Sequence, residues 1–188
     1  MRIIGGKYKG KKLSQPLDKT TRPLKDLVKE SIFNIIQHSK KINIQLENSK
    51  VLDLYAGSGS FGLECISRDA ELVYFFEKHS NAVKILNKNL KILNKELNYE
   101  IYNKDCLTFI ASENFIEKNF DIIFLDPPFA ENFFINDLKN IKKLKIINRN
   151  HLVVIHREKK SEDDLNEVLT ILLSKNYGRS KILFGKLT

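Results

Sequence analysis

Apolar and polar residues alternate along most of the chain in blocks that fit short strands and amphipathic helices in turn. Mostly apolar segments of four to six residues, rich in β-branched and aromatic side chains, predict strands. These predicted strands cover residues 51–55, 72–77, 99–103, 120–125 and 151–156. Predicted helices cover residues 61–68, 80–93, 107–115, 134–144 and 163–174, with Ser80 as an N-cap. Such alternation predicts an α/β fold, a doubly wound and mostly parallel sheet with helices on both faces.

The two ends of the chain depart from this pattern. Residues 1–13, MRIIGGKYKGKKL, mix apolar and basic residues around three glycines, which predicts a small hairpin that is an appendage rather than part of the core. The C-terminal YGRSKILFGKLT predicts a final strand or hairpin. We therefore divide the chain into a basic arm, residues 1–22, and a Rossmann-like domain, residues 23–188.

A further helix is predicted to begin at Pro23, a residue suited to a first helical turn, and to pack on the main domain. Its apolar face is expected to present four residues: Leu27, Ile32, Ile35 and Ile36.

Composition narrows the class of protein. With 188 residues, 42% hydrophobic residues and a mean hydropathy of -0.30, the chain can bury one sizeable core. It has no apolar run of about 18 residues for a membrane span and no secretory signal, so we expect a cytoplasmic protein, and we expect it to be a monomer. Cys65 and Cys106 lack metal-ligand and CxxC spacing, and the histidines lack HExxH spacing. We expect reduced, buried thiols and no metal.

The net charge of +9 is concentrated at one end, because residues 1–25 carry +7 of it. A basic arm on a nearly neutral body is typical of a polyanion-docking element, although a solvated lysine-rich surface would look the same. The candidate RNA-binding residues are Arg2, Lys7, Tyr8, Lys9, Lys11, Lys12 and Arg22. Tyr8, between lysines, is the candidate to stack on an unpaired base.

A glycine-rich loop, AGSGSFG, follows the predicted strand 51–55. Its spacing satisfies GxGxxG, which is a weak signal alone but allows a ligand to approach the backbone closely. Glu77, at the end of the next strand, is placed to accept the hydroxyls of a ribose. Asp53 suits a cationic amino-acid ligand better than a pyrophosphate, which favours S-adenosylmethionine; it could equally hold the loop amides. Asp105 is a candidate acceptor for the adenine amino group or an ordinary helix N-cap.

The motif FLDPPF, residues 124–129, ends a predicted buried strand in a rigid turn. Asp126 offers carboxylate oxygens, and Pro127 and Pro128 lack N–H groups and fix an extended turn that leaves the Pro127 carbonyl as an acceptor. Phe129 supplies a flat ring. Two acceptors and a ring suit the exocyclic amine of a stacked base. If the first and fourth strands are neighbours, this motif and the glycine loop open into one crevice.

LDLYAGSGSFGLE followed by FLDPPF resembles the Rossmann-type amino-methyltransferases of nucleic acids. MRIIGGKYKGKKL with TRPLKDLVKESIFNII resembles the bacterial enzymes that methylate guanine N2 in 16S ribosomal RNA, a likeness that extends to YGRSKILFG. The resemblance implies S-adenosylmethionine bound by Glu77 and by the Asp53–Gly59 segment, which contains Ala56, Gly57, Ser58 and Gly59. It implies catalysis at Asp126–Phe129 and a late small-subunit assembly intermediate as substrate.

Three alternatives stay open on the sequence. An adenine-N6 methyltransferase acting on DNA or RNA shares DPPF, but for DNA it would ordinarily need a recognition domain for which there is no room. A nicotinamide-dependent oxidoreductase fits GxGxxG but leaves DPPF unexplained. A non-catalytic RNA-binding module would transfer no methyl group to any RNA.

Overall fold

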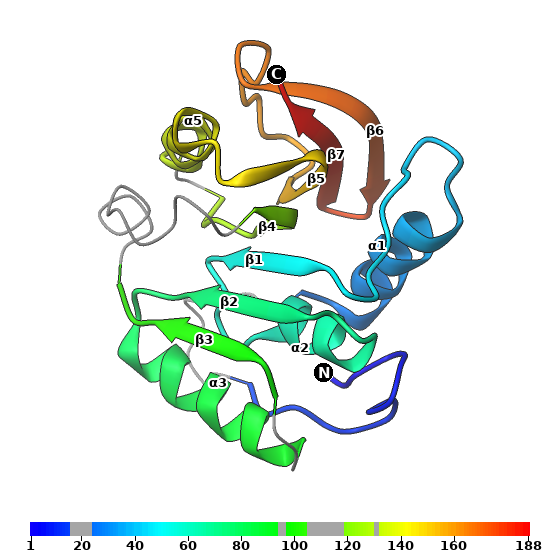
Figure 1. Cartoon of the computed structure of the whole chain (residues 1–188), viewed down its shortest axis with the longest axis vertical. Coiled ribbons are helices and arrows are strands. Elements are labelled where there is room, and N and C mark those ends of the chain that lie inside the picture. The colour runs from blue at the N-terminus through cyan, green and yellow to red at the C-terminus, as the bar shows by residue number, and fades with distance from the viewer. Residues whose placement is uncertain (16–23, 94–96, 105–118, 130–131) are drawn as a thin grey trace.

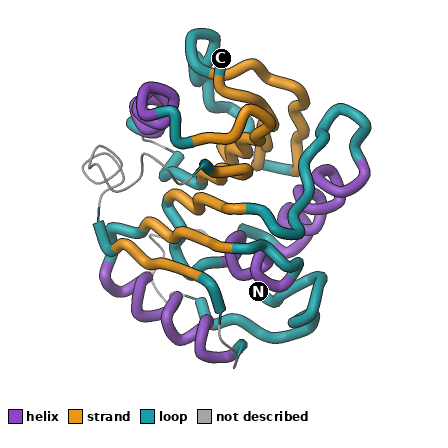
Figure 2. Tube along the Cα trace, in the orientation of Figure 1, coloured by secondary structure: helices purple, strands orange, loops and turns teal. Residues whose placement is uncertain are grey.

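The computed structural model describes residues 1–15, 24–93, 97–104, 119–129 and 132–188, and its centre is a seven-stranded sheet (Figures 1 and 2). The helices are α1 (Asp26–His38), α2 (Ser60–Ser67), α3 (Ser80–Ile92) and α5 (Phe134–Leu144). The strands are β1 (Lys50–Leu54), β2 (Leu72–Phe76), β3 (Tyr99–Tyr102), β4 (Phe120–Leu125), β5 (Ile147–Glu158), β6 (Leu169–Tyr177) and β7 (Ser180–Leu187).

The strand order is β3-β2-β1-β4-β5-β7-β6. Strands β3, β2, β1, β4 and β5 are parallel, and β7 lies antiparallel between β5 and β6. The α/β, mostly parallel sheet and the final strand near the C-terminus are as predicted, and β1 and β4 are neighbours. The predicted helix over residues 107–115 lies outside the described residues.

Residues along each central strand point alternately to the two faces of the sheet, and both faces are buried. On one face, Val51, Phe75 and Phe124 join a core cluster with residues of α1, α2 and α3. On the other, residues such as Leu52 and Ile123 pack with α5. Near-continuous apolar strands are the pattern of a sheet covered on both faces, and Figure 1 shows the helices on its two sides.

The predicted helix over residues 163–174 is wrong. Leu165 and Val168 lie in a turn, in which the amides of Val168 and Leu169 both donate to the Leu165 carbonyl, and β6 begins at Leu169. The apolar residues of this segment are spaced as in a helix, but residues 169–177 pair with β7 instead. The pairing runs from Leu169↔Leu187 to Tyr177↔Ser180. That pairing depends on residues later in the chain, so tertiary context overrides the local pattern.

Two details of the helices also differ from the predictions. In α1 the buried face comprises Val28, Lys29, Ile32, Phe33 and Ile36, whereas Leu27 is 68% exposed. Residues spaced four apart lie on the same side of a helix, so Val28, Ile32 and Ile36 form the buried face and Leu27 lies outside it. In α3, Ser80 is the first helical residue and His79 is the N-cap, and the Ser80 hydroxyl bonds Asn103 instead.

The expectation that residues 1–13 form an appendage outside the core is wrong. Ile3, Tyr8 and Leu13 are buried in the same core cluster as α1 and α2. The segment is hairpin-like, with an antiparallel bridge between Arg2 and Lys12. The expected boundary at residues 22 and 23 lies outside the described residues.

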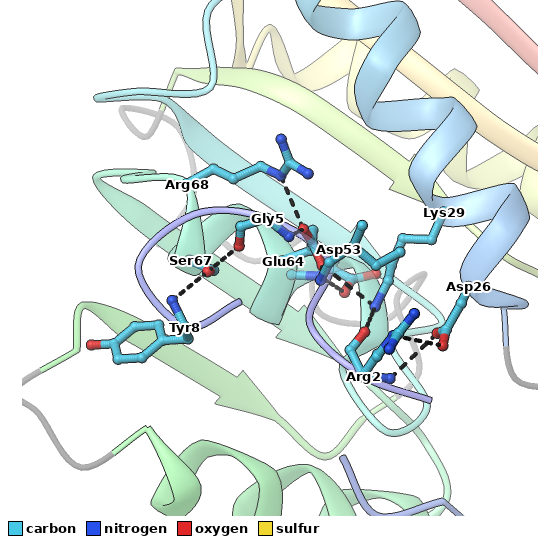
Figure 3. Close-up of polar contacts among 11 residues, drawn as sticks. Arg2, Gly5, Tyr8, Asp26, Lys29, Asp53, Glu64, Ser67 and Arg68 are labelled. Atoms are coloured by element: carbon cyan, nitrogen blue, oxygen red, sulfur yellow. Dashed lines mark hydrogen bonds and ion pairs between the residues drawn. The ribbon is translucent and has the colours of Figure 1, made fainter. Parts of the chain in front are cut away.

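Glu64 of α2 fastens this arm to the body (Figure 3). Its carboxylate accepts the amides of Ile4 at 2.8 Å and Gly5 at 2.7 Å. It also pairs with the ammonium group of Lys29 at 3.5 Å, and both side chains are fully buried. Burial lowers the pKa of Lys29, opposed by the attraction of Glu64. These contacts make the arm part of the folded unit.

The backbone of the arm continues along the end of α2. The Ser67 hydroxyl donates to the Gly5 carbonyl at 2.6 Å and accepts the Tyr8 amide at 3.0 Å. Gly6 has φ +73°, and a Cβ there would lie 1.8 Å from the Ser67 carbonyl oxygen. A side chain at this position would therefore push the arm off the helix.

Candidate active site

The carboxyl ends of β1 and β4 lie side by side and carry the two motifs. Their register pairs Leu54 with Leu125, and the Asp126 amide donates to the Leu54 carbonyl at 3.4 Å. Strand β2 flanks β1 on its other side. The glycine loop after β1 and the DPPF turn after β4 thus meet where the strand order reverses, the usual place for a ligand in an open α/β sheet.

The glycine loop is a left-handed turn that opens its backbone to a ligand. Tyr55, Gly57 and Gly59 have positive φ values of 63°, 55° and 81°. A Cβ on Gly59 would lie 2.3 Å from a methyl carbon of Leu86, which would have to shift, and the positive φ itself favours glycine there. A Cβ on Gly57 would meet nothing within 4 Å among the described residues, so that side of Gly57 is not filled by them.

The rest of the loop is fixed by backbone bonds. The Ala56 amide donates to the Phe76 carbonyl at 2.9 Å, and the Gly59 amide donates to the Ala56 carbonyl at 2.8 Å. The side chain of the buried Asn89 donates to the Ser58 carbonyl at 2.9 Å. Asn89 also exchanges two hydrogen bonds with the backbone of Ser14, so one side chain joins the arm to the loop.

Glu77 sits beside this loop at the end of β2. Its two carboxylate oxygens accept the Gly57 amide at 2.8 Å and the His79 amide at 2.7 Å. The residue is 6% exposed. Because each carboxylate oxygen has two lone pairs, Glu77 keeps acceptor capacity for a ribose while it holds the loop.

Asp53 is buried beneath the loop with one oxygen satisfied. Its Oδ2 accepts the Gly62 amide at 2.9 Å, and its Oδ1 has no hydrogen-bond partner among the described residues. Burial raises the pKa of Asp53 well above its usual value, and the nearby carboxylates of Asp126 and Glu77 raise it further. An unpaired acceptor among like charges fits a cationic ligand group, such as the ammonium of S-adenosylmethionine.

The DPPF turn is held from β5. His156 Nδ1 lies 2.8 Å from Asp126 Oδ1, and the rings of His156 and Phe129 meet edge to face with centroids 5.5 Å apart. The Arg157 guanidinium donates to the carbonyls of Pro128 at 3.1 Å and Phe129 at 3.2 Å. No bond to the Pro127 carbonyl is found within the described part of the chain, which leaves it as an acceptor.

Arg157 is itself buried and paired. Its guanidinium makes two bonds of 2.9 Å to the carboxylate of Asp163 and packs over the ring of Phe134. The side chains of Arg157 and Asp163 are 1% and 3% exposed. This buried pair fixes the Arg157 guanidinium, which in turn holds the carbonyls of the DPPF turn.

Sequence reasoning missed His156, Arg157, Ser180 and Asn89 as supports of the site. A signal existed for His156, because it ends the predicted strand 151–156 and would lie at the same sheet edge as Asp126. No local pattern marks the other three. Their roles depend on contacts with segments at least six residues away in the sequence.

The candidate RNA-binding residues of the arm differ in their exposure and in their partners within the protein. Tyr8 is buried, and Lys11 lies over its ring and donates to the Ile92 carbonyl at 2.6 Å. The expectation that Tyr8 stacks on a base is therefore wrong, since its ring lies in the core cluster. Lys7 pairs with Asp69, whose hydrogen bond raises the Lys7 pKa, and Arg2 pairs with Asp26 at 3.9 Å.

Lys9 and Lys12 are exposed, and Arg22 and Asp105 lie outside the described residues. At Lys7 the arm contacts the end of α2 that is farthest from the glycine loop, through Ser67 and Asp69. An eight-residue helix is about 12 Å long, so this part of the arm lies about that far from the loop.

Other expected features concern metal, thiols and membrane spans. Within the described ranges, no group of three or more histidine, cysteine or acidic residues is arranged to hold a metal ion. Cys65 is a free, buried thiol whose pKa is raised by burial, and Cys106 lies outside the described residues. None of the helices in those ranges combines the length and the apolar character of a membrane span.

Fold and site together define a class I methyltransferase that uses S-adenosylmethionine. A ribosomal protein L11 methylase from Lactobacillus delbrueckii superposes with a TM-score of 0.62 at 15% identity, over 84% of this chain and 76% of that chain. A solved Escherichia coli protein, yhhF, gives a TM-score of 0.81 at 26% identity, over 100% of this chain and 97% of that chain. Another neighbour, with a TM-score of 0.62, was solved with S-adenosylhomocysteine.

The chain belongs to the family described as "Conserved hypothetical protein 95", whose model matches residues 1–186. It is 32% identical to the ribosomal RNA small subunit methyltransferase D of Haemophilus influenzae over 95% of this chain and 89% of that protein. The protein of the same name from Buchnera aphidicola subsp. Acyrthosiphon pisum is 33% identical over 93% of this chain and 83% of that protein. These relatives favour methyl transfer over the nicotinamide alternative.

Proposed function

We propose that this protein methylates the exocyclic N2 amine of a guanine in 16S ribosomal RNA, with a small-subunit assembly intermediate as substrate. The observation that carries the proposal is the meeting of the two motifs, in which the Asp126 amide bonds the last residue of β1 beside the glycine loop. Relatives named as small-subunit RNA methyltransferases, matching over most of their length, support this choice of substrate.

We assign the cofactor to the glycine loop that follows β1. When bound, S-adenosylmethionine supplies a methyl group made electrophilic by the adjacent sulfonium. Asp53 Oδ1, unpaired among the described residues, would accept its ammonium group, and Glu77 would accept from its ribose. The side of Gly57 that the described residues leave unfilled and the backbone of Ala56, Ser58 and Gly59 would take the rest of the ligand. Asp105 stays a candidate for the adenine contact.

The DPPF turn would hold the target amine. Asp126 and the Pro127 carbonyl would accept its two N–H bonds, and Phe129 would stack on the base. These acceptors favour a pyramidal nitrogen, whose lone pair is then available for attack, and Asp126 takes up the proton that the nitrogen loses. No covalent enzyme intermediate is needed in this scheme.

RNA docking is assigned to the exposed lysines of the arm. Lys9 and Lys12 are exposed, and an ammonium group on a flexible stem contacts phosphate without reading bases. An arm that extends about one helix length from the glycine loop suits a large folded RNA, which can reach both places at once.

The decisive experiment is methyl transfer from radiolabelled S-adenosylmethionine to small subunits and to naked ribosomal RNA from a strain that lacks this gene. Nucleoside analysis of the product is expected to yield N2-methylguanosine. The matched control is Asp126→Ala, which should lower kcat by about a hundredfold to ten-thousandfold with cofactor affinity unchanged. Recovery of N6-methyladenosine would instead identify the adenine-N6 alternative, and no incorporation into any RNA would contradict the proposal.

A further inference from the structure

Asp126 is the end of a chain of polar contacts that runs through β5 to β7. His156 Nδ1 lies 2.8 Å from Asp126 Oδ1, and His156 Nε2 lies 2.8 Å from the Ser180 hydroxyl. Leu125 and Ile155 are paired across β4 and β5, so the residues that follow them lie at the same level of the sheet. Ser180 reaches this level because it begins β7 opposite Glu158. The antiparallel hairpin thus contributes to the site.

With a carboxylate at Asp126 and a neutral imidazole at His156, the three residues can be joined in one sense only, whereas an imidazolium would donate to both neighbours. A carboxylate has no hydrogen to donate, so the hydrogen between it and His156 is on Nδ1. A neutral imidazole with Nδ1–H has a lone pair on Nε2, which must accept the hydroxyl hydrogen of Ser180. In that state the donors run from Ser180 to His156 to Asp126, and the hydrogen of the imidazole is on Nδ1.

We propose that His156, oriented by Ser180, is a positioning residue for Asp126 and Phe129 in methyl transfer to a base amine. The inference rests on the proposed function. With Oδ1 bound to His156, the carboxylate cannot rotate freely, and Oδ2 is left for the amine. The same imidazole meets the Phe129 ring edge to face at 5.5 Å. Both groups assigned to hold the base therefore rest on one buried ring.

The proton lost by the target amine goes to Asp126 and is not passed on to His156. The lone pair of the amine would form the bond to the methyl group as the methyl–sulfur bond of S-adenosylmethionine breaks and leaves its electron pair on sulfur. One N–H bond then breaks, its electron pair stays on nitrogen, and the proton forms an O–H bond at Asp126 Oδ2. His156 keeps its Nδ1 hydrogen throughout. Its contribution is a donor that holds the carboxylate in the correct orientation before the reaction.

The first test needs neither RNA nor cofactor. Nitrogen-15 chemical shifts of the imidazole, recorded on the full chain labelled at histidine and assigned with a His156→Asn variant, report which nitrogen carries the hydrogen. The expected result is the Nδ1–H tautomer for His156. The Ser180→Ala variant should lose part of this preference, because the donor to Nε2 is gone. An Nε2–H tautomer in the wild-type protein would overturn the inference.

The second test compares two replacements of the same ring. His156→Phe keeps a ring against Phe129 but removes the donor, whereas His156→Asn retains an N–H near the position of Nδ1. We expect kcat to fall by about tenfold to a hundredfold in the Phe variant, the size expected for losing one hydrogen bond to a charged group. In the Asn variant kcat should recover at least in part, with cofactor affinity, measured by calorimetry, unchanged in both.

Each outcome decides the inference. A His156→Phe variant with wild-type kcat, or a His156→Asn variant no more active than Phe, would overturn it. If the Phe variant does not fold, Ser180→Ala, which alters a residue outside the core clusters, carries the kinetic comparison, and an unchanged kcat there would count against the inference. Where the wild-type protein methylates no RNA, the proposed function fails, and the tautomer measurement decides the inference alone.

Discussion

Glu77 Oε2 accepts the Gly57 amide at 2.8 Å, so the residue assigned to the ribose also holds the glycine loop. Its other oxygen accepts the His79 amide at 2.7 Å, at the start of α3. One carboxylate at the end of β2 therefore fixes the loop after β1 and the helix that follows β2. If Glu77 holds the ribose as proposed, ligand binding and local order at this edge of the sheet depend on the same side chain.

Replacing Glu77 by Ala should weaken S-adenosylmethionine binding by about 1 to 3 kcal/mol, because the variant lacks both the ribose acceptors and the loop anchor. Chemistry at saturating cofactor should be largely preserved. Glu77→Gln, which keeps one acceptor oxygen, should fall between Ala and wild type in a calorimetric titration. Equal affinities for all three proteins would remove Glu77 from the cofactor site.

Asp53→Asn should stabilise the cofactor-free protein and weaken cofactor binding. Burial raises the pKa of Asp53 in the folded state, so the folded protein binds this proton more tightly than the unfolded chain. The wild type therefore loses stability as pH rises from the unfolded pKa, about 4, to the higher folded pKa. Asn has no such dependence and still accepts the Gly62 amide.

The measurement for Asp53 is thermal unfolding of both proteins between about pH 5 and about pH 8, where the unfolded carboxyl is already ionised. The advantage of Asn should grow with rising pH. Calorimetry at neutral pH should show weaker S-adenosylmethionine binding, because the ammonium loses its counter-charge. A constant difference in Tm across this range would show that Asp53 does not titrate within it.

Arg157→Leu should destabilise the fold by about 3 to 5 kcal/mol, because it leaves the buried Asp163 carboxylate without its partner. The double variant Arg157→Leu with Asp163→Leu should recover much of that loss in urea unfolding. Its kcat should nevertheless stay low, since the carbonyls of Pro128 and Phe129 still lack their donor. Recovery of both stability and kcat would show that Arg157 does not position the DPPF turn.

Glu64→Ala should destabilise the protein by about 3 to 5 kcal/mol. The variant leaves the buried Lys29 ammonium and the backbone amides of Ile4 and Gly5 without their carboxylate partner. The matched control is Glu71→Ala, whose half-exposed carboxylate pairs with Lys50 at 3.8 Å and should matter by less than about 1 kcal/mol. Denaturant unfolding distinguishes the two. Equal stabilities would show that the arm is not fixed through Glu64.

Lys9→Ala with Lys12→Ala should weaken RNA binding without loss of stability, because both side chains are exposed. For every phosphate that the variant no longer neutralises, the slope of log affinity against log salt should flatten by about 0.7 to 0.9. Lys7→Ala is the matched control of like charge, since Lys7 is already paired with Asp69. If the double variant keeps the wild-type slope, the arm is not the docking element.

The sequence by itself determined the central sheet and both chemical motifs. The predicted strands overlap β1 to β5, although β5 begins at Ile147, four residues before the predicted strand. The central strands were visible locally because a strand covered on both faces needs a short, almost continuous apolar run. AGSGSFG and DPPF are likewise local, since glycine and proline constrain their own backbone. The positions of Asp53 inside β1, and of Glu77 and Asp126 just after β2 and β4, followed from these boundaries.

Tertiary structure alone decided the features that depend on distant partners. Residues 169–177 form β6 because β7 is available to pair with them, and Tyr8 is buried because Glu64 and Ser67 of α2 accept the backbone amides of Gly5 and Tyr8. His156 meets Asp126 and Ser180 only because the sheet order sets β4, β5 and β7 side by side. Local propensity carries no information about such pairings, because hydrogen bonding and burial between segments far apart in sequence are fixed only when the chain closes on itself.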